Sequence, residues 1–150
     1  GYEQYAQVRF VWQRGALAVF AHSQYSYSGG AHGMGLTHYR LLDLASQRWL
    51  QLDDIVLPSQ QNALLDLLIE SYREQHPELA ESWLASTRKE QVEQLLTDNI
   101  LPLADGLQFN YAPYVLGSYA DGQVELKLTQ QQLRGLVRAD LMPAALTSGD

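Results

Sequence analysis

Apolar and polar residues alternate with a period of two through the first fifty residues, which is the pattern of β-strands. The segment QVRFVW places Val8, Phe10 and Trp12 on one face, and ALAVFAHSQYSYS follows a turn at Arg14–Gly15. A third strand, LTHYRLLDL, comes after a glycine-rich stretch, and a turn at residues 46–48 closes a hairpin with RWLQL. Because these connections are short, we expect neighbouring strands to be antiparallel.

The middle of the chain changes to helical spacing after Pro58, and Ser59 is in position to cap the first helix. The apolar stripe of this helix consists of Leu64, Leu67, Leu68 and Tyr72. Pro77 fits the first position of a short second helix. Thr87 and Glu90 have the spacing of a capping box, which predicts a third helix.

Strands return near the end of the chain, where GLQFNY and GQVELKL alternate apolar and polar residues. Between the ends of GLQFNY and GQVELKL the dipeptide Asp121–Gly122 is a hairpin-turn signal. Thr129 and Gln132 resemble a capping box for a last helix. The order ββββ-αα(α)-ββ-α predicts an α+β domain over residues 1–150, with an antiparallel sheet and helices packed mainly on one face.

Composition narrows the classes of function. The chain is 46% hydrophobic with a net charge of −7, which allows a real core and argues against nucleic acid or an anionic membrane surface as partner. It has no cysteine, which excludes disulfides and thiolate sites. No apolar run approaches the roughly twenty residues that span a bilayer. Since the chain begins at Gly1 and enters a strand pattern at once, we expect a domain excised from a longer protein, with any signal peptide or membrane anchor lying upstream.

The glycine-rich stretch YSYSGGAHGMGLTHYR, residues 25–40, raises the question of a phosphate or catalytic site. It does not match G-x-G-x-x-G or the P-loop, no lysine follows it, and no helix is predicted after it. A connection between strands, with glycines at positive φ, explains the stretch more simply.

Histidine chemistry is the other possibility in this region. His22, His32 and His38 could supply three zinc ligands, although no compact ligand motif such as H-E-x-x-H is present. Ser26 and Ser28 could join His32 and Asp43 in a triad, but neither serine lies on a G-x-S-x-G elbow. We therefore assign no catalytic residue, no metal ligand and no cofactor. A metal-assisted hydrolase using His22, His32 and His38 remains the alternative.

The segment FNYAPYVLGSYADG is the best binding-surface candidate. It places Tyr111, Tyr114 and Tyr119 around Pro113, between two predicted strands. Tyrosine rings supply a large contact area at a low entropy cost and are enriched at interfaces.

Residues 25–56 and 105–137 together resemble the RsiV-like C-terminal domain family. Gly29, Gly30, Ala31 and His32 match its G-G-A-H turn. Its second hallmark is matched by Asp105, Gly106, Tyr111, Pro113, Tyr114, Tyr119, Ala120 and Gly122. The chain departs from the usual form in having Ala112 before Pro113, where asparagine is common, and in lacking a second proline before Tyr119.

The resemblance implies an extracytoplasmic module of anti-sigma factors, bacterial lipoproteins and some peptidoglycan deacetylases. The module itself is not known as an enzyme, and in the anti-sigma branch it binds lysozyme through its loops. We therefore expect a periplasmic or extracytoplasmic, non-enzymatic binding or sensing domain whose partner is a lysozyme-like protein or peptidoglycan. The expected binding residues are Gly29, Gly30, His32, Tyr111, Pro113, Tyr114 and Tyr119. A purely structural envelope domain is a further alternative.

Overall fold

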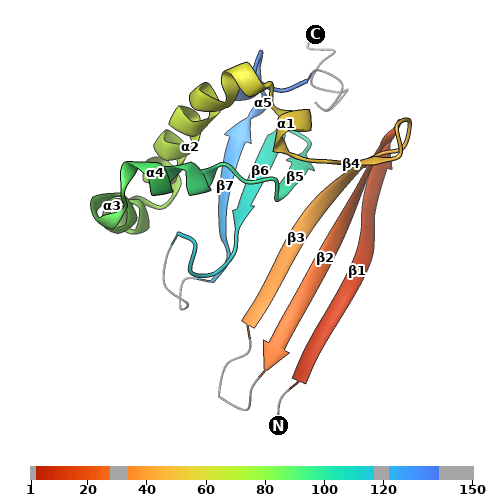
Figure 1. Cartoon of the computed structure of the whole chain (residues 1–150), viewed down its shortest axis with the longest axis horizontal. Helices are drawn as coiled ribbons and strands as arrows, with labels where there is room; N and C mark the ends of the chain where they lie inside the picture. The colour runs from red at the N-terminus through yellow and green to blue at the C-terminus, as the bar shows by residue number, and fades with distance from the viewer. Residues whose placement is uncertain (1–2, 28–33, 117–121, 139–150) are drawn as a thin grey trace.

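The computed structural model describes residues 3–27, 34–116 and 122–138. The first four strands form an antiparallel sheet in the order β1-β2-β3-β4. They are β1 (Glu3–Arg14), β2 (Leu17–Tyr27), β3 (Met34–Asp43) and β4 (Arg48–Leu50). Figure 1 shows that one end of β1, β2 and β3 projects away from all the helices, with β1 on the outside.

A second antiparallel sheet, in the order β5-β6-β7, lies beside the helices. Its strands are β5 (Ile100–Leu103), β6 (Gly106–Tyr111) and β7 (Val124–Thr129). The helical segments are α1 (Leu52–Ile55), η1 (Pro58–Gln60), α2 (Gln61–Gln75), α3 (Pro77–Ser86), α4 (Lys89–Val92), η2 (Glu93–Leu95) and α5 (Gln130–Leu133). Within the described ranges, no helix has both the length and the apolar character needed to span a bilayer.

The core lies between α2 and the second sheet. Leu64, Leu68 and Tyr72, which recur at helical spacing, are fully buried on α2. On β7, residues are alternately buried and exposed, as the period-two pattern predicts. Removing this apolar surface from water is the main stabilising contribution to the fold.

Two side-chain amides join the sheets along the edge of β3. The Tyr39 N–H donates to Asn99 Oδ1 over 2.8 Å, and Asn99 Nδ2 donates to the Thr37 carbonyl over 3.0 Å. Gln123 makes the same double contact with Thr37, accepting from its N–H and donating to its carbonyl. Asn99 and Gln123 thus occupy places that the backbone of a neighbouring strand would take in a continuous sheet.

The predicted α+β class and the order of elements are confirmed. The strands form two sheets, however, and β5 is an additional strand that the pattern did not indicate. Pro102 explains the omission, because proline within an apolar run argues against a strand. It is accommodated here since β5 lies at the edge of its sheet.

Three local predictions near the helices were wrong. The strand predicted over RWLQL ends at Leu50, because the next residues, Leu52–Ile55, form the helical turn α1. Ser59 lies inside η1 and caps nothing, and α4 starts at Lys89 rather than after a Thr87 cap. The Thr129–Gln132 capping box is confirmed, with Gln132 N–H donating to Thr129 Oγ1 over 3.2 Å.

A β-bulge overturns the predicted common face of Val8, Phe10 and Trp12. The register with β2 shifts between Phe10 and Trp12, so Phe10 lies opposite Phe20 while Trp12 lies opposite Val19. Because an extra residue in a strand reverses the alternation, the later part of β1 turns its apolar side chains to the opposite face.

Candidate functional site

The segment after β6, residues 112–116, is held in place by side chains of two helices. Tyr72 of α2 donates its hydroxyl to the Leu116 carbonyl over 2.7 Å. Trp83 of α3 donates its indole N–H to the Val115 carbonyl over 3.1 Å. Val115 N–H in turn donates to Ala112 O, which closes a tight turn. The backbone of this turn is therefore fixed from the core side.

Tyr114 stands at the tip of that turn. Its φ is 78°, in the left-handed region that residues other than glycine rarely adopt. Its side chain is 64% exposed, while Pro113 beside it is half-buried. An unfavourable backbone conformation persists only where the surroundings impose it, and such residues cluster at binding sites. The structure therefore presents an aromatic ring to solvent on a rigid support.

Tyr111 has a different place from Tyr114. Its ring is 2% exposed, and its hydroxyl donates to the Leu95 carbonyl over 2.7 Å. Burial raises the pKa of the Tyr111 hydroxyl, which stays protonated and able to donate. Tyr111 thus anchors the end of β6 in the core and offers no ring to a partner. Tyr119 lies outside the described residues.

A hollow of about 570 Å³ lies where α3 begins and β7 starts. It is lined by His76, Pro77, Glu78, Leu79, Ser82, Gln123 and Val124. Gln123 and Val124 follow closely on the segment that begins at Tyr114, and α3 is the helix whose Trp83 supports the turn. Trp83 thus links the Tyr114 turn to α3, the helix that lines this hollow.

The structure places two of the three predicted histidine ligands, His22 and His38. His22 and His38 are register partners on β2 and β3, so they share one face of the sheet. His38 Nε2 lies 3.4 Å from Asp98 Oδ1, whereas the buried Nε2 of His22 finds no hydrogen-bond partner among the described residues. Among the described residues, no group of three or more histidine or acidic side chains is placed to hold a metal ion. His32, like Gly29 and Gly30, lies outside these residues.

The ionisation of His38 is set by opposing influences. Burial lowers the pKa of His38 below the ordinary imidazole value, and the positive charge of Arg40 and the neighbouring His22 act in the same direction. Asp98 raises the pKa of His38, but by less than burial lowers it. His38 is thus mainly neutral at pH 7.

Asp43, the acid of the considered triad, has a local structural role. Its carboxylate accepts hydrogen bonds from the Ala45 and Ser46 N–H groups over 3.0 and 3.4 Å. This is the pattern of an aspartate that stabilises the turn following a strand. Ser28 and His32 of that triad lie outside the described residues, and Ser26, opposite Met34, is at the other end of the β2–β3 pair from Asp43, which is opposite Leu17.

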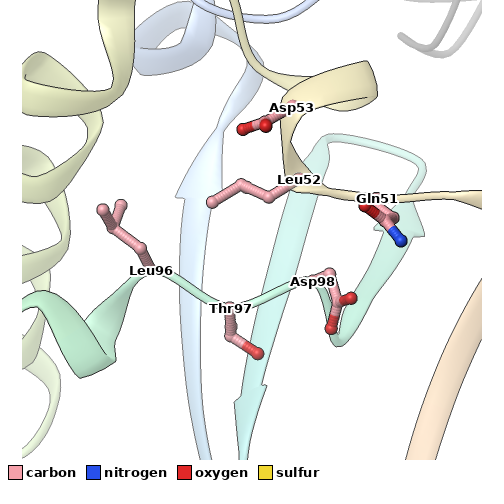
Figure 2. Close-up of a pocket in the computed structure, with 6 residues that line it drawn as sticks. All are labelled: Gln51, Leu52, Asp53, Leu96, Thr97 and Asp98. Carbon is pink, nitrogen blue, oxygen red and sulfur yellow. The ribbon is translucent and has the colours of Figure 1, made fainter. Parts of the chain in front are cut away.

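A second hollow, of about 350 Å³, is formed by α1 and the segment before β5 (Figure 2). Two carboxylates line it, Asp53 and Asp98, from parts of the chain far apart in sequence. Asp53 accepts a hydrogen bond from Gln61 Nε2, and Asp98 pairs with His38. Figure 2 shows that the two carboxylates do not point toward each other. Both acids thus have local partners, and this hollow has no evident paired-acid geometry.

The chain belongs to the DUF3298 family, described as a protein of unknown function, whose signature matches residues 53–131. The match includes α2, the second sheet and the Tyr114 turn. No curated protein matches the chain at a significant level.

Two solved structures have the same fold. A DUF3298 family protein from Pseudomonas aeruginosa PAO1 is 22% identical, with a TM-score of 0.75 over 96% of this chain and 66% of its own. A member from Bacteroides fragilis NCTC 9343 is 27% identical, with a TM-score of 0.70 over 92% and 55%. The chain therefore spans less than two thirds of the length of either protein.

The sequence pattern points to Tyr114 but not to the residues that hold its turn in place. Tyr72 and Trp83 were expected only as helix residues, yet each directs a polar ring atom at the turn. One feature of the sequence indicates such support: a buried tyrosine or tryptophan requires a hydrogen-bond partner for its O–H or N–H. Which carbonyl supplies that partner depends on tertiary packing.

Proposed function

We propose that this DUF3298 chain is an RsiV-like extracytoplasmic module that binds a partner without catalysing a reaction. The observation that carries the proposal is the Tyr114 turn, where hydrogen bonds from Tyr72 and Trp83 hold an exposed aromatic ring at positive φ. Rigid aromatic side chains are the commonest anchors of protein interfaces, because little entropy is lost when they bind. The binding surface consists of Pro113 and Tyr114, and we extend it to Tyr119, Gly29, Gly30 and His32 on the basis of the sequence.

A basic protein of the lysozyme type is the partner that the charge favours. The chain carries a net charge of −7, and opposite charge accelerates encounter and helps to orient the partners. The resemblance to the lysozyme-binding branch points the same way. Peptidoglycan is the other envelope ligand to be compared with it.

The test is binding of lysozyme, measured by calorimetry, with a cell-wall pull-down in parallel. Tyr114→Ala should weaken lysozyme binding by about 30-fold, the effect expected of a central aromatic anchor. Leu57→Ala is the control, because Leu57 is an exposed apolar residue, 43% exposed, that lies outside the proposed surface. Equal binding by wild type and Tyr114→Ala would remove the turn from the site. If wild type binds only the cell wall, the ligand is the polymer rather than the protein.

A further inference from the structure

The outer strand of the first sheet, β1, exposes apolar side chains that no described residue covers. Val8 is 61% and Phe10 54% exposed, and β1 is exposed at every residue from Gln4 to Phe10. Phe10 contacts Phe20 edge-on at 5.7 Å between ring centroids, and Phe20 contacts Trp49 at 5.6 Å. These rings form an apolar row that runs across the sheet to β1. Contiguous exposed patches of this kind usually mark an interaction surface.

The register identifies which backbone groups of β1 face outward. Thr37 and Tyr39 direct their N–H groups away from β2, to Gln123 and Asn99. Their partners on β2, Ser23 and Ala21, therefore direct theirs toward β1, where they lie opposite Gln7 and Arg9.

Gln7 and Arg9 therefore direct their N–H and C=O groups inward, to β2. Ala6, Val8 and Phe10 alternate with them and direct theirs to the outer edge. Within the described residues, β1 pairs only with β2. The outward-facing backbone groups thus belong to the same three residues that carry the apolar side chains of this face.

Edge strands of soluble proteins normally carry features that prevent pairing, such as proline, lysine or a central bulge. From Gln4 to Phe10 there is no proline and no lysine, and Arg9 is the single charged residue. The bulge lies beyond Phe10, which leaves this part of the edge regular. The strand is therefore competent to pair with another strand.

We propose that β1 pairs with β1 of a second copy of this chain, forming a two-fold homodimer with a continuous sheet. An antiparallel pairing centred on Val8 places Ala6 opposite Phe10 of the second copy, and Val8 opposite its own equivalent. The small Ala6 side chain therefore lies opposite the large Phe10 side chain, and every pair is apolar. The outward N–H and C=O groups of both strands form hydrogen bonds across the seam. Arg9 lies opposite Gln7, so no like charges oppose each other.

The dimer has a distinctive dependence on salt. Each copy has a net charge of −7, while residues 4–10 of β1 contribute only the positive charge of Arg9. Repulsion therefore acts between the bodies of the two copies rather than at the seam. Salt screens that repulsion and strengthens the dimer, whereas it weakens a complex with a basic partner. Dimer formation through β1 does not depend on what the Tyr114 turn binds.

A single introduced cysteine tests the seam, because the chain contains none. In the pairing centred on Val8, the two Val8 Cα atoms lie about 5.5 Å apart, within the range of a disulfide. Val8→Cys should form a covalent dimer rapidly when oxidised glutathione is added. Leu57→Cys is the matched control, since Leu57 is 43% exposed but is distant in sequence from β1. Equal rates of cross-linking for the two variants would overturn the proposal.

Sedimentation velocity across a range of concentrations supplies a second measurement. Wild type should dimerise, and Val8→Lys should weaken dimerisation by about tenfold or more, because two lysines then face each other at the centre of the seam. Leu57→Lys should dimerise as wild type does. Circular dichroism checks that both variants are folded. A wild type that stays monomeric at every concentration and salt level would overturn the dimer and leave the edge to a strand of another polypeptide.

Discussion

The side chain of Asn99 completes the edge of β3 by bonding to the backbone of Tyr39 and of its neighbour two residues earlier. Its Oδ1 accepts from the Tyr39 N–H over 2.8 Å, and its Nδ2 donates to the Thr37 carbonyl over 3.0 Å. Asn99 is itself buried. One amide therefore ties the four-stranded sheet to the sheet that carries the Tyr114 turn.

Asn99→Ala should lower the free energy of unfolding by about 2 kcal/mol, because it leaves the half-buried Tyr39 N–H without its partner and removes one of the two side-chain donors to the Thr37 carbonyl. Urea unfolding followed by circular dichroism measures the change. Asn62→Ala, on the exposed surface of α2, is the control and should change stability by less than about 0.5 kcal/mol. If the two variants lose the same stability, Asn99 does not join the sheets in the way described.

Tyr72→Phe should loosen the Tyr114 turn, because it removes the hydroxyl that donates to Leu116 O. We expect a loss of about 1–2 kcal/mol and faster hydrogen exchange at the Val115 N–H, which lies inside the turn. Tyr111→Phe removes a similar buried bond, to Leu95 O, outside the turn.

The comparison of these two variants separates a general loss of stability from a local effect. Both should lose similar stability, but only Tyr72→Phe should accelerate exchange at Val115 relative to the core amides. An equal acceleration in both variants would show that the turn is not specifically held by Tyr72.

The Tyr114→Gly variant should be more stable than the Tyr114→Ala variant. The φ of 78° costs a residue with a Cβ roughly 1–2 kcal/mol, and glycine avoids that cost. We therefore expect the free energy of unfolding, measured by heat or urea, to be about 1 kcal/mol higher for Tyr114→Gly than for Tyr114→Ala. Tyr25, an exposed strand residue, provides the control, since Tyr25→Ala should be more stable than Tyr25→Gly. A more stable alanine at position 114 would contradict the left-handed conformation.

Several features set by neighbouring residues were predictable from the sequence, whereas those set by distant contacts were not. The Thr129–Gln132 cap and the alternation along β7 depend on residues a few positions apart, and both are confirmed. The Asn99–Tyr39 contact joins residues sixty positions apart.

The same distinction holds for the candidate site. The exposed Tyr114 could be proposed from a proline- and tyrosine-rich segment alone. Its positive φ and its support by Trp83 depend on where α3 packs. The bulge beyond Phe10 likewise has no signal in the apolar pattern, because it reverses the alternation without changing composition.

The stability of the domain should fall as the pH drops through the range in which His38 titrates. Burial lowers the pKa of His38 in the folded state, despite the opposing effect of Asp98. The unfolded chain, with an imidazole pKa of about 6.5, then binds a proton more readily than the folded chain. The contribution of His38 is therefore fully present above about pH 6.5, and it is lost as the pH falls toward the folded pKa.

Nuclear magnetic resonance titration of His38 measures the folded pKa directly, and Asp98→Asn provides the sharpest comparison. Removing the carboxylate that raises the pKa leaves burial, Arg40 and His22, which all lower it. Asp98→Asn should therefore lower the His38 pKa further and steepen the loss of stability in acid. Since Asp98 faces His38 across 3.4 Å, an unchanged pKa in that variant would show that the two side chains are not paired in solution.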